Sequence, residues 1–188
     1  MENTLEKIRN YADRAHGDQL RKYTPDRYIV HPVRVMKLCQ TVSTELPVLA
    51  CALLHDVLED TQVTEREMND FLKPLLGDSE AEKTVKLVIE LTDVYVKSNY
   101  PRLNRRERKA KELQRIKTIS PAAQTVKYAD IMDNCLEIVD HDNGFAPVFL
   151  NECRQLLDVM EKGDSRLRSA ALEVIENNLK RLKNKNTQ

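Results

Sequence analysis

The sequence predicts an all-α protein, a single helical bundle of about eight or nine helices. Apolar residues recur at helical spacing through most of the 188-residue chain. The chain contains only four glycines, and its seven prolines fall mostly at breaks between the periodic segments. This scarcity of turn residues favours helices over a many-stranded sheet.

Several predicted helices begin at a recognisable signal. Thr64 and Glu67 form a capping-box pattern, and Ser120–Pro121 combines an N-cap residue with a first-turn proline. The helix that opens at Pro47 is apolar nearly all round, so we expect it in the centre of the protein. The predicted helices cover residues 4–16, 32–42, 47 into the segment 55–61, 64–76, 80–96, 105–119, 121–138, 147–161 and 165–182.

Composition and charge narrow the class of protein. We expect one domain over residues 1–188, with its core motifs in about 10–140 and the helices of 147–182 completing it. Basic and acidic residues balance at 30 each, which argues against a nucleic-acid partner. No apolar run is long enough for a membrane span, and the polar N-terminus does not resemble a signal peptide. The cytoplasm is the expected compartment, and oligomer formation is left open.

The four cysteines lie far apart in the sequence and form no CxxC pair. This spacing argues against a thiolate zinc site and against a disulfide framework. We expect each thiol to lie in or near the core as a small hydrophobic group.

The segment His55-Asp56-Val57-Leu58-Glu59-Asp60-Thr61 is the strongest chemical signal, because it closes the most apolar helix. In a helix, His55 and Glu59 are four residues apart, and so are Asp56 and Asp60. An imidazole and three carboxylates should therefore share a small volume. Carboxylates this close repel one another unless a cation lies among them, so the segment predicts a divalent metal site.

Further ligands come from other parts of the chain. His31 lies at an extended-to-helix junction, and Asp130 follows an apolar lead-in. Imidazole nitrogens together with carboxylate oxygens suit Mn, Fe, Co, Ni or Zn better than Mg or Ca. Glu59 and Asp60 would then be free to orient and deprotonate a water molecule. A simpler interpretation makes Asp130 a buried carboxylate paired with Lys127.

These residues resemble the HD-domain phosphohydrolases, in which the pattern H…HD…D recurs. The wider resemblance, over roughly residues 10–140, is to the hydrolase domain of RelA/SpoT homologues, in particular the stand-alone small alarmone hydrolases. The matching segments are 15–16, 21–22, 28–32, 54–61, 90–93, 107–109, 120–123 and 127–130.

The resemblance implies a hydrolase that uses a Mn²⁺ site. Its small nucleotide substrate would be guanosine tetra- or pentaphosphate, from which it would remove the 3′-pyrophosphate. By motif position, the metal ligands would be His31, His55, Asp56 and Asp130. Glu59 and Asp60 would be the pair that activates water. Arg21 and Lys22 would reach the nucleotide or its phosphates, and Asn134 would contact the nucleoside.

The chain departs from this family after Asp130. The family commonly reads ADRLHN or ADKLYN, whereas this chain has Ile131 in place of the basic residue and Asp133 in place of the histidine or aromatic residue. Another nucleotide, such as nicotinamide dinucleotide phosphate, therefore stays an alternative substrate. An alternative of another class is a nucleotide-binding or antitoxin-like module without turnover, against which the pair Glu59–Asp60 argues.

Two further charged features have more than one interpretation. The basic segment 102–115 is either a solvated helix face with local ion pairs or a surface that steers phosphates into a cleft. His141–Asp142 repeats the HD dipeptide, but no apolar helix leads into it. We interpret it as part of a polar loop.

Overall fold

The computed structural model describes residues 1–185, and these residues form ten helical segments and no β-strand. The predicted all-α class is confirmed, and the count exceeds the expected number because one segment is a single turn. The segments are α1 (Glu2–His16), α2 (Val30–Gln40), α3 (Leu46–Leu54), α4 (Val57–Asp60), α5 (Glu65–Leu76), α6 (Asp78–Leu91), α7 (Arg105–Ile116), α8 (Pro121–His141), α9 (Ala146–Val159) and α10 (Ser165–Lys185).

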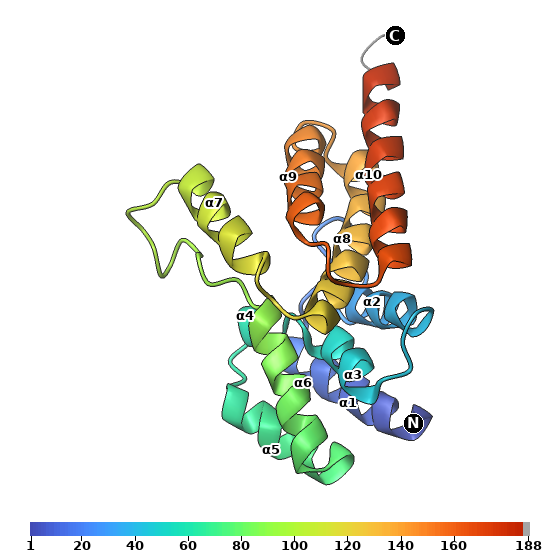
Figure 1. Ribbon diagram of the computed structural model, residues 1–188, viewed down its shortest axis with the longest axis vertical. Helices are drawn as coiled ribbons and strands as arrows, with labels where there is room; N and C mark the ends of the chain where they lie inside the picture. The colour runs from blue at the N-terminus through green and yellow to red at the C-terminus, as the bar shows by residue number, and fades with distance from the viewer. Residues whose placement is uncertain (186–188) are drawn as a thin grey trace.

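The helices form two groups that meet at α2 and α8 (Figure 1). One group contains α1, α3, α5 and α6, and the other contains α8, α9 and α10. The helix α8 packs against α2, α3 and α6 as well as against α9 and α10. The helix α7 stands to one side, at the end of a long connection from α6, and packs against α9. This arrangement makes α8 the element that joins the two groups.

The helix α3 lies in the core, as its sequence predicts. Every residue from Pro47 to Leu54 is buried. Each large apolar side chain of this kind contributes about 1.5–3 kcal/mol when it leaves water, so α3 anchors the fold. The segment that follows α3 therefore starts from a fixed position in the interior.

The expectation that one helix runs on into residues 55–61 is wrong. The helix α3 ends at Leu54, and His55 and Asp56 form a turn before α4 begins at Val57. Asp56 occupies the N-cap position of α4, and its carbonyl accepts the N–H of Asp60 at 2.9 Å, but its side chain makes no capping hydrogen bond and accepts one from the Tyr28 hydroxyl instead. The turn, not a helical repeat of four, sets the directions of these side chains.

Other helix ends also differ from the prediction, among them those of α6 and α8. The helix α6 ends at Leu91, and beyond it the buried Glu112 carboxylate accepts the N–H groups of Val94 and Tyr95, each at 3.2 Å. These two N–H groups therefore bond to a side chain and not to a further helical turn. The helix α8 runs to His141, so this histidine belongs to a helix and not to a loop.

Other expectations hold for the part of the chain that the structure describes. Thr64 and Glu67 form both hydrogen bonds of a capping box, and the Ser120 hydroxyl accepts the N–H of Ala123. The four cysteines are all buried and free: Cys39, Cys51, Cys135 and Cys153. None of the helices within residues 1–185 combines the length and the hydrophobicity that crossing a bilayer requires.

Candidate metal centre and active site

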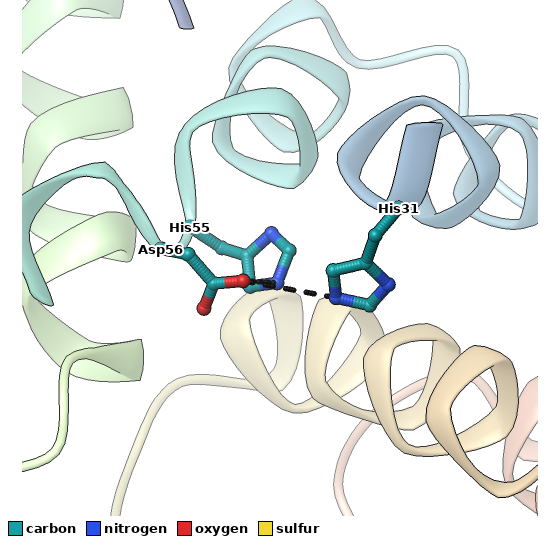
Figure 2. Close-up of side chains that lie close together, drawn as sticks. All are labelled: His31, His55 and Asp56. Carbon is teal, nitrogen blue, oxygen red and sulfur yellow. Dashed lines mark ion pairs between the residues drawn. The ribbon is translucent and has the colours of Figure 1, made fainter. Parts of the chain in front are cut away.

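Four side chains from three parts of the fold meet beside α8. His31 comes from the first turn of α2, His55 and Asp56 come from the turn after α3, and Asp130 lies on α8. Figure 2 shows His31 pointing toward His55 and Asp56, with the ribbon of α8 passing close by. All four residues that the sequence singled out as ligands are therefore brought together.

The distances within the cluster are short. The Asp56 Oδ2 atom lies 2.9 Å from His55 Nε2 and 3.7 Å from His31 Nε2. The Asp130 Oδ1 atom lies 3.2 Å from His31 Nε2 and 3.7 Å from His55 Nε2. One atom each from His31, His55 and Asp56 lie within 4.8 Å of one another, a spacing that a single metal ion can bridge.

The cluster fits a divalent cation. The Nε2 atoms of His31 and His55 are buried and have no hydrogen-bond partner among the described residues. Burial alone would lower the pKa of His55, yet the neighbouring carboxylates of Asp56 and Asp130 raise it well above its usual value. The Asp56 and Asp130 carboxylates thus favour a positive charge between them and the two imidazoles. A divalent ion supplies that charge and accepts both imidazole lone pairs.

Tyr28 does more than pack behind His31, because it contacts a proposed ligand of this centre directly. Its hydroxyl donates a hydrogen bond of 2.5 Å to Asp56 Oδ2. Burial and the Asp56 charge both raise the pKa of Tyr28, so the phenol keeps its proton. Its ring also lies against the ring of His16, with 4.5 Å between centroids. Tyr28 therefore links the end of α1 to the metal centre.

Glu59 and Asp60 point to different segments. The Glu59 carboxylate accepts the backbone N–H of Asp93 at 3.0 Å, whereas Asp60 accepts a bond from the Gln19 side chain at 3.3 Å. Burial, followed by the charge of Asp93, raises the pKa of Glu59 to about 7. The pair therefore does not form one unit, and Glu59 has the proton affinity of a general base near neutral pH.

The outer oxygen of Asp130 pairs with Lys127. Its Oδ2 atom lies 2.9 Å from the Lys127 ammonium, while Oδ1 accepts a 2.7 Å bond from the Asn134 amide. The simpler interpretation of Asp130 as an ion-paired carboxylate is thus correct, and it coexists with the position beside the two histidines. Burial would lower the pKa of Lys127, but Asp130 and Asp93 raise it, so the ammonium stays charged.

The residues expected to contact substrate do not all lie together. The Arg21 guanidinium donates to Asn134 at 3.0 Å, so these two reach the edge of the centre. Lys22 lies apart from them. Its ammonium contacts the Tyr23 hydroxyl at 2.7 Å and Asp142 at 3.9 Å, and its side chain is 69% exposed.

A cavity of about 710 Å³ opens beside Asp130, between α7, α8 and α9. Its apolar wall includes Ile131, Phe149 and Leu156. Its cations are contributed mainly by α7 and are Arg105, Arg106, Lys109 and Lys127. Part of the basic segment 102–115 therefore lines the cavity next to the metal centre. Local ion pairs also exist there, since Arg105 pairs with Glu152 and Lys109 lies 3.5 Å from Asp93.

The sequence reasoning missed two residues behind His31. Asp133 accepts a 2.7 Å hydrogen bond from His31 Nδ1, and Arg34 pairs with Asp133 through Nε at 2.7 Å. The signal was present, because Asp133 departs from the family pattern and Arg34 lies one turn beyond His31.

The fold and the cluster define a class, namely an all-helical protein whose centre suits a divalent cation. Residues 28–135, more than half of the chain, match the family model of the HD domain. The chain belongs to the HD-domain family. This family and the cluster of His31, His55 and Asp56 together indicate dependence on a divalent metal.

Curated relatives extend the match. The human protein MESH1, named guanosine-3′,5′-bis(diphosphate) 3′-pyrophosphohydrolase, is 33% identical over 134 residues, which cover 69% of this chain and 66% of MESH1. A Mycoplasma pneumoniae protein with the name "probable guanosine-3′,5′-bis(diphosphate) 3′-pyrophosphohydrolase" is 25% identical over 140 residues. That match covers 71% of this chain but only 18% of the much longer relative. The predicted resemblance is therefore confirmed.

Solved structures share the fold. A metazoan orthologue of SpoT, described as hydrolysing ppGpp, superposes with a TM-score of 0.76 and 23% identity, over 93% of this chain and 94% of the other. A Listeria monocytogenes protein superposes with a TM-score of 0.59 and 20% identity, over 82% of this chain and 97% of the other. At these identities the likeness shows the helical architecture alone.

Proposed function

We propose that this protein is a metal-dependent phosphohydrolase that removes the 3′-pyrophosphate from guanosine tetra- or pentaphosphate. The observation that carries the proposal is the pair of buried histidine nitrogens that make no hydrogen bond and face the Asp56 and Asp130 carboxylates at the edge of a basic cavity. The names of the human and Mycoplasma relatives support the choice of substrate.

The metal ligands in this proposal are His31, His55, Asp56 and Asp130, and the ion is Mn²⁺. Imidazole nitrogens with carboxylate oxygens suit a first-row transition-metal ion, and the choice of Mn²⁺ among these ions follows from the resemblance to the small alarmone hydrolases. When bound, such an ion polarises a phosphoryl oxygen and lowers the pKa of coordinated water. Tyr28 holds Asp56 through its hydroxyl, and Asn134 holds Asp130 through its amide.

Glu59 takes the proton from the attacking water in this mechanism. Its pKa of about 7 keeps a substantial fraction ionised at neutral pH, while its affinity for a proton stays high. The N–H of Asp93 fixes one oxygen of the carboxylate. Asp60, held by Gln19, completes the acidic surroundings and orients the water.

Cations of the chain bind the phosphates of the substrate. Lys127 lies beside Asp130 and lines the cavity, so it stands next to the position of the attacked phosphate. Arg105 and Lys109 provide positive charge farther along the same wall. Arg21 reaches the nucleoside side of the centre, where it already contacts Asn134. Such a distribution compensates negative charge that builds up in the transition state.

A product assay tests the proposal. Purified protein with Mn²⁺ is offered guanosine tetraphosphate, nicotinamide dinucleotide phosphate and nucleoside triphosphates, with Asp56→Ala as the inactive control. We expect guanosine diphosphate and pyrophosphate from the first substrate, and a loss of about 10³-fold or more in the variant, as expected when several kcal/mol of metal catalysis disappear.

Other outcomes separate the alternatives. Turnover of nicotinamide dinucleotide phosphate alone would keep the mechanism and change the substrate, in line with the apolar wall at Ile131 and Phe149. Bound Mn²⁺ without turnover of any nucleotide would favour a binding module. Full activity in Asp56→Ala would contradict the metal site itself.

A further inference from the structure

We propose that Asp133 is a positioning residue of the metal centre, which holds the His31 imidazole in the orientation and tautomer needed for a divalent ion. Arg34 in turn fixes the Asp133 carboxylate. The inference rests on the proposed function only through the role of His31 as a metal ligand. It concerns a residue at which this chain departs from the ADRLHN and ADKLYN patterns.

The contact between Asp133 and His31 determines the tautomer. Asp133 is 3% exposed and lies on α8, one turn beyond Asp130. Its Oδ2 atom lies 2.7 Å from His31 Nδ1. Because a carboxylate oxygen only accepts, this nitrogen carries the hydrogen and donates a hydrogen bond to Asp133. The lone pair of the imidazole is then on Nε2, the atom that faces Asp56 and Asp130. A carboxylate partner of this kind also makes the imidazole a stronger ligand.

Arg34 fixes the position of the carboxylate. Its Nε donates to Asp133 Oδ1 at 2.7 Å and its Nη2 donates to Oδ2 at 3.1 Å. This two-point contact sets both the distance and the plane of the Asp133 carboxylate. The same guanidinium reaches Glu137 at 2.6 Å. Arg34 lies one turn beyond His31 on α2, so the same helix positions both side chains.

A chain of hydrogen bonds connects Arg34 and Asp133 to the other side of the metal centre. Glu137 also accepts from Arg21 at 3.3 Å, Arg21 donates to Asn134 at 3.0 Å, and Asn134 donates to Asp130 at 2.7 Å. The two ligands His31 and Asp130 are thus joined by a continuous chain of contacts. Members of this chain are His31, Asp133, Arg34, Glu137, Arg21, Asn134 and Asp130.

The two histidines of the centre are oriented by different means. His55 donates its Nδ1 hydrogen to the carbonyl of Ala52 at 2.9 Å, a contact within its own turn of chain. His31 relies on a side chain from another helix. The Nδ1 partner of His31 can therefore be removed by changing one side chain, whereas that of His55 is a backbone carbonyl, and this difference makes the proposal testable.

The test measures Mn²⁺ binding to the metal-free 188-residue chain by calorimetry, without nucleotide. Asp133→Asn keeps the size of the side chain but loses its negative charge and one of its two acceptor oxygens, so it cannot accept from His31 Nδ1 and from both Arg34 donors. We expect Mn²⁺ affinity to fall about 10–100-fold, the usual cost of removing such a partner. Asp140→Asn is the matched control, because Asp140 lies on the same helix and pairs with Arg181. Its affinity should stay within about twofold of the unsubstituted protein.

A second variant and a second readout cover the case in which Asp133→Asn does not fold. Arg34→Met leaves the bond between Asp133 and His31 in place and should weaken Mn²⁺ binding by a smaller factor, about 3–10-fold. With guanosine tetraphosphate as probe, both variants should need more Mn²⁺ for half-maximal rate and recover most of kcat at saturating Mn²⁺.

Unchanged Mn²⁺ affinity in folded Asp133→Asn would overturn the inference, whatever its unfolding temperature. If that variant does not fold, unchanged affinity in Arg34→Met would overturn it. An effect of Asp140→Asn as large as that of Asp133→Asn would also do so, because the loss would then reflect general damage to α8. Because no nucleotide enters the calorimetry, weakened binding without hydrolysis of guanosine tetraphosphate would support the inference and contradict only the proposed function.

Discussion

The buried cluster at α8 and the wall formed by α7 differ in how firmly their side chains are held. His31 and His55 are 1% and 3% exposed, and each ring nitrogen that faces away from the cluster has a partner. On the wall, the Arg105 and Lys109 side chains are 47% and 49% exposed and form ion pairs at its rim. Exposed pairs of this kind contribute at most about 1 kcal/mol.

This difference assigns different tasks to the two regions. A centre that holds a metal must keep its ligands in place before the ion arrives, which buried imidazoles held by a hydrogen bond at Nδ1 can do. A wall that selects a charged substrate needs cations that can leave their partners and bind phosphate. Glu59 lies where the regions meet, because it belongs to α4 and bonds to Asp93 at the start of the connection to α7. The following changes test this division, beginning with the largest effect.

Glu59→Gln should separate metal binding from turnover. The variant keeps the shape of the side chain but cannot accept a proton, so we expect kcat to fall about 10²–10⁴-fold. Mn²⁺ affinity should stay close to that of the unsubstituted protein, since Glu59 is not among the clustered ligands. The measurement pairs product release with calorimetry, and the exposed Glu82→Gln serves as control. A variant with normal kcat would remove Glu59 from the role of base.

The pH profile should follow the ionisation of Glu59. Its pKa is raised from 4.5 to about 7, so the carboxyl is protonated and inactive as a base at low pH. Activity should therefore rise about tenfold per pH unit below this pKa and level off above it. A bound divalent ion stabilises the carboxylate, so the midpoint with Mn²⁺ should lie at or below pH 7. A profile in Glu59→Gln with the same rising limb would assign the midpoint to another group.

Changes on the wall should affect substrate binding more than chemistry. Removing the charges in Arg105→Ala and Lys109→Ala should raise KM several-fold, about 2–10-fold each, and leave kcat within about threefold. The effect should shrink as salt increases, because exposed charges are screened. Lys117→Ala, at the end of α7 and outside the cavity lining, is the control. A larger effect on kcat than on KM would place these cations at the reacting phosphate.

The smallest effect on activity is expected from a change in α5, away from both regions. Thr64→Ala removes the N-cap of α5 and should lower the free energy of unfolding by about 1 kcal/mol. Because this helix contributes no residue to the centre or to the cavity, kcat and KM should not change. Denaturant unfolding and a standard rate assay make the measurement, and Thr64→Asn should restore most of the stability. A fall in kcat would mean that α5 supports the centre more directly than its contacts show.

Local signals in the sequence were enough to predict most of the helices. The capping box at Thr64, the N-cap at Ser120 and the apolar run of α3 act within a few residues of chain, so pattern alone reveals them. The proposed ligand set came instead from the motif positions of the family that the chain resembles, because its members lie far apart in the sequence. The local prediction failed in the segment 55–61. The pattern predicted one continuous helix there, but α3 ends before this segment and Asp56 lies at the start of α4.

The sequence by itself determined the helical class, the central position of α3 and the residue types that could hold a divalent ion. Only the tertiary structure decided which partners those residues have. The divergence of Glu59 and Asp60, the separation of Lys22 from Arg21, and the contact of Asp133 with His31 all depend on segments distant in sequence. Helical periodicity reports the face on which a side chain lies, but the packing of α2, α7 and α8 determines what it meets there.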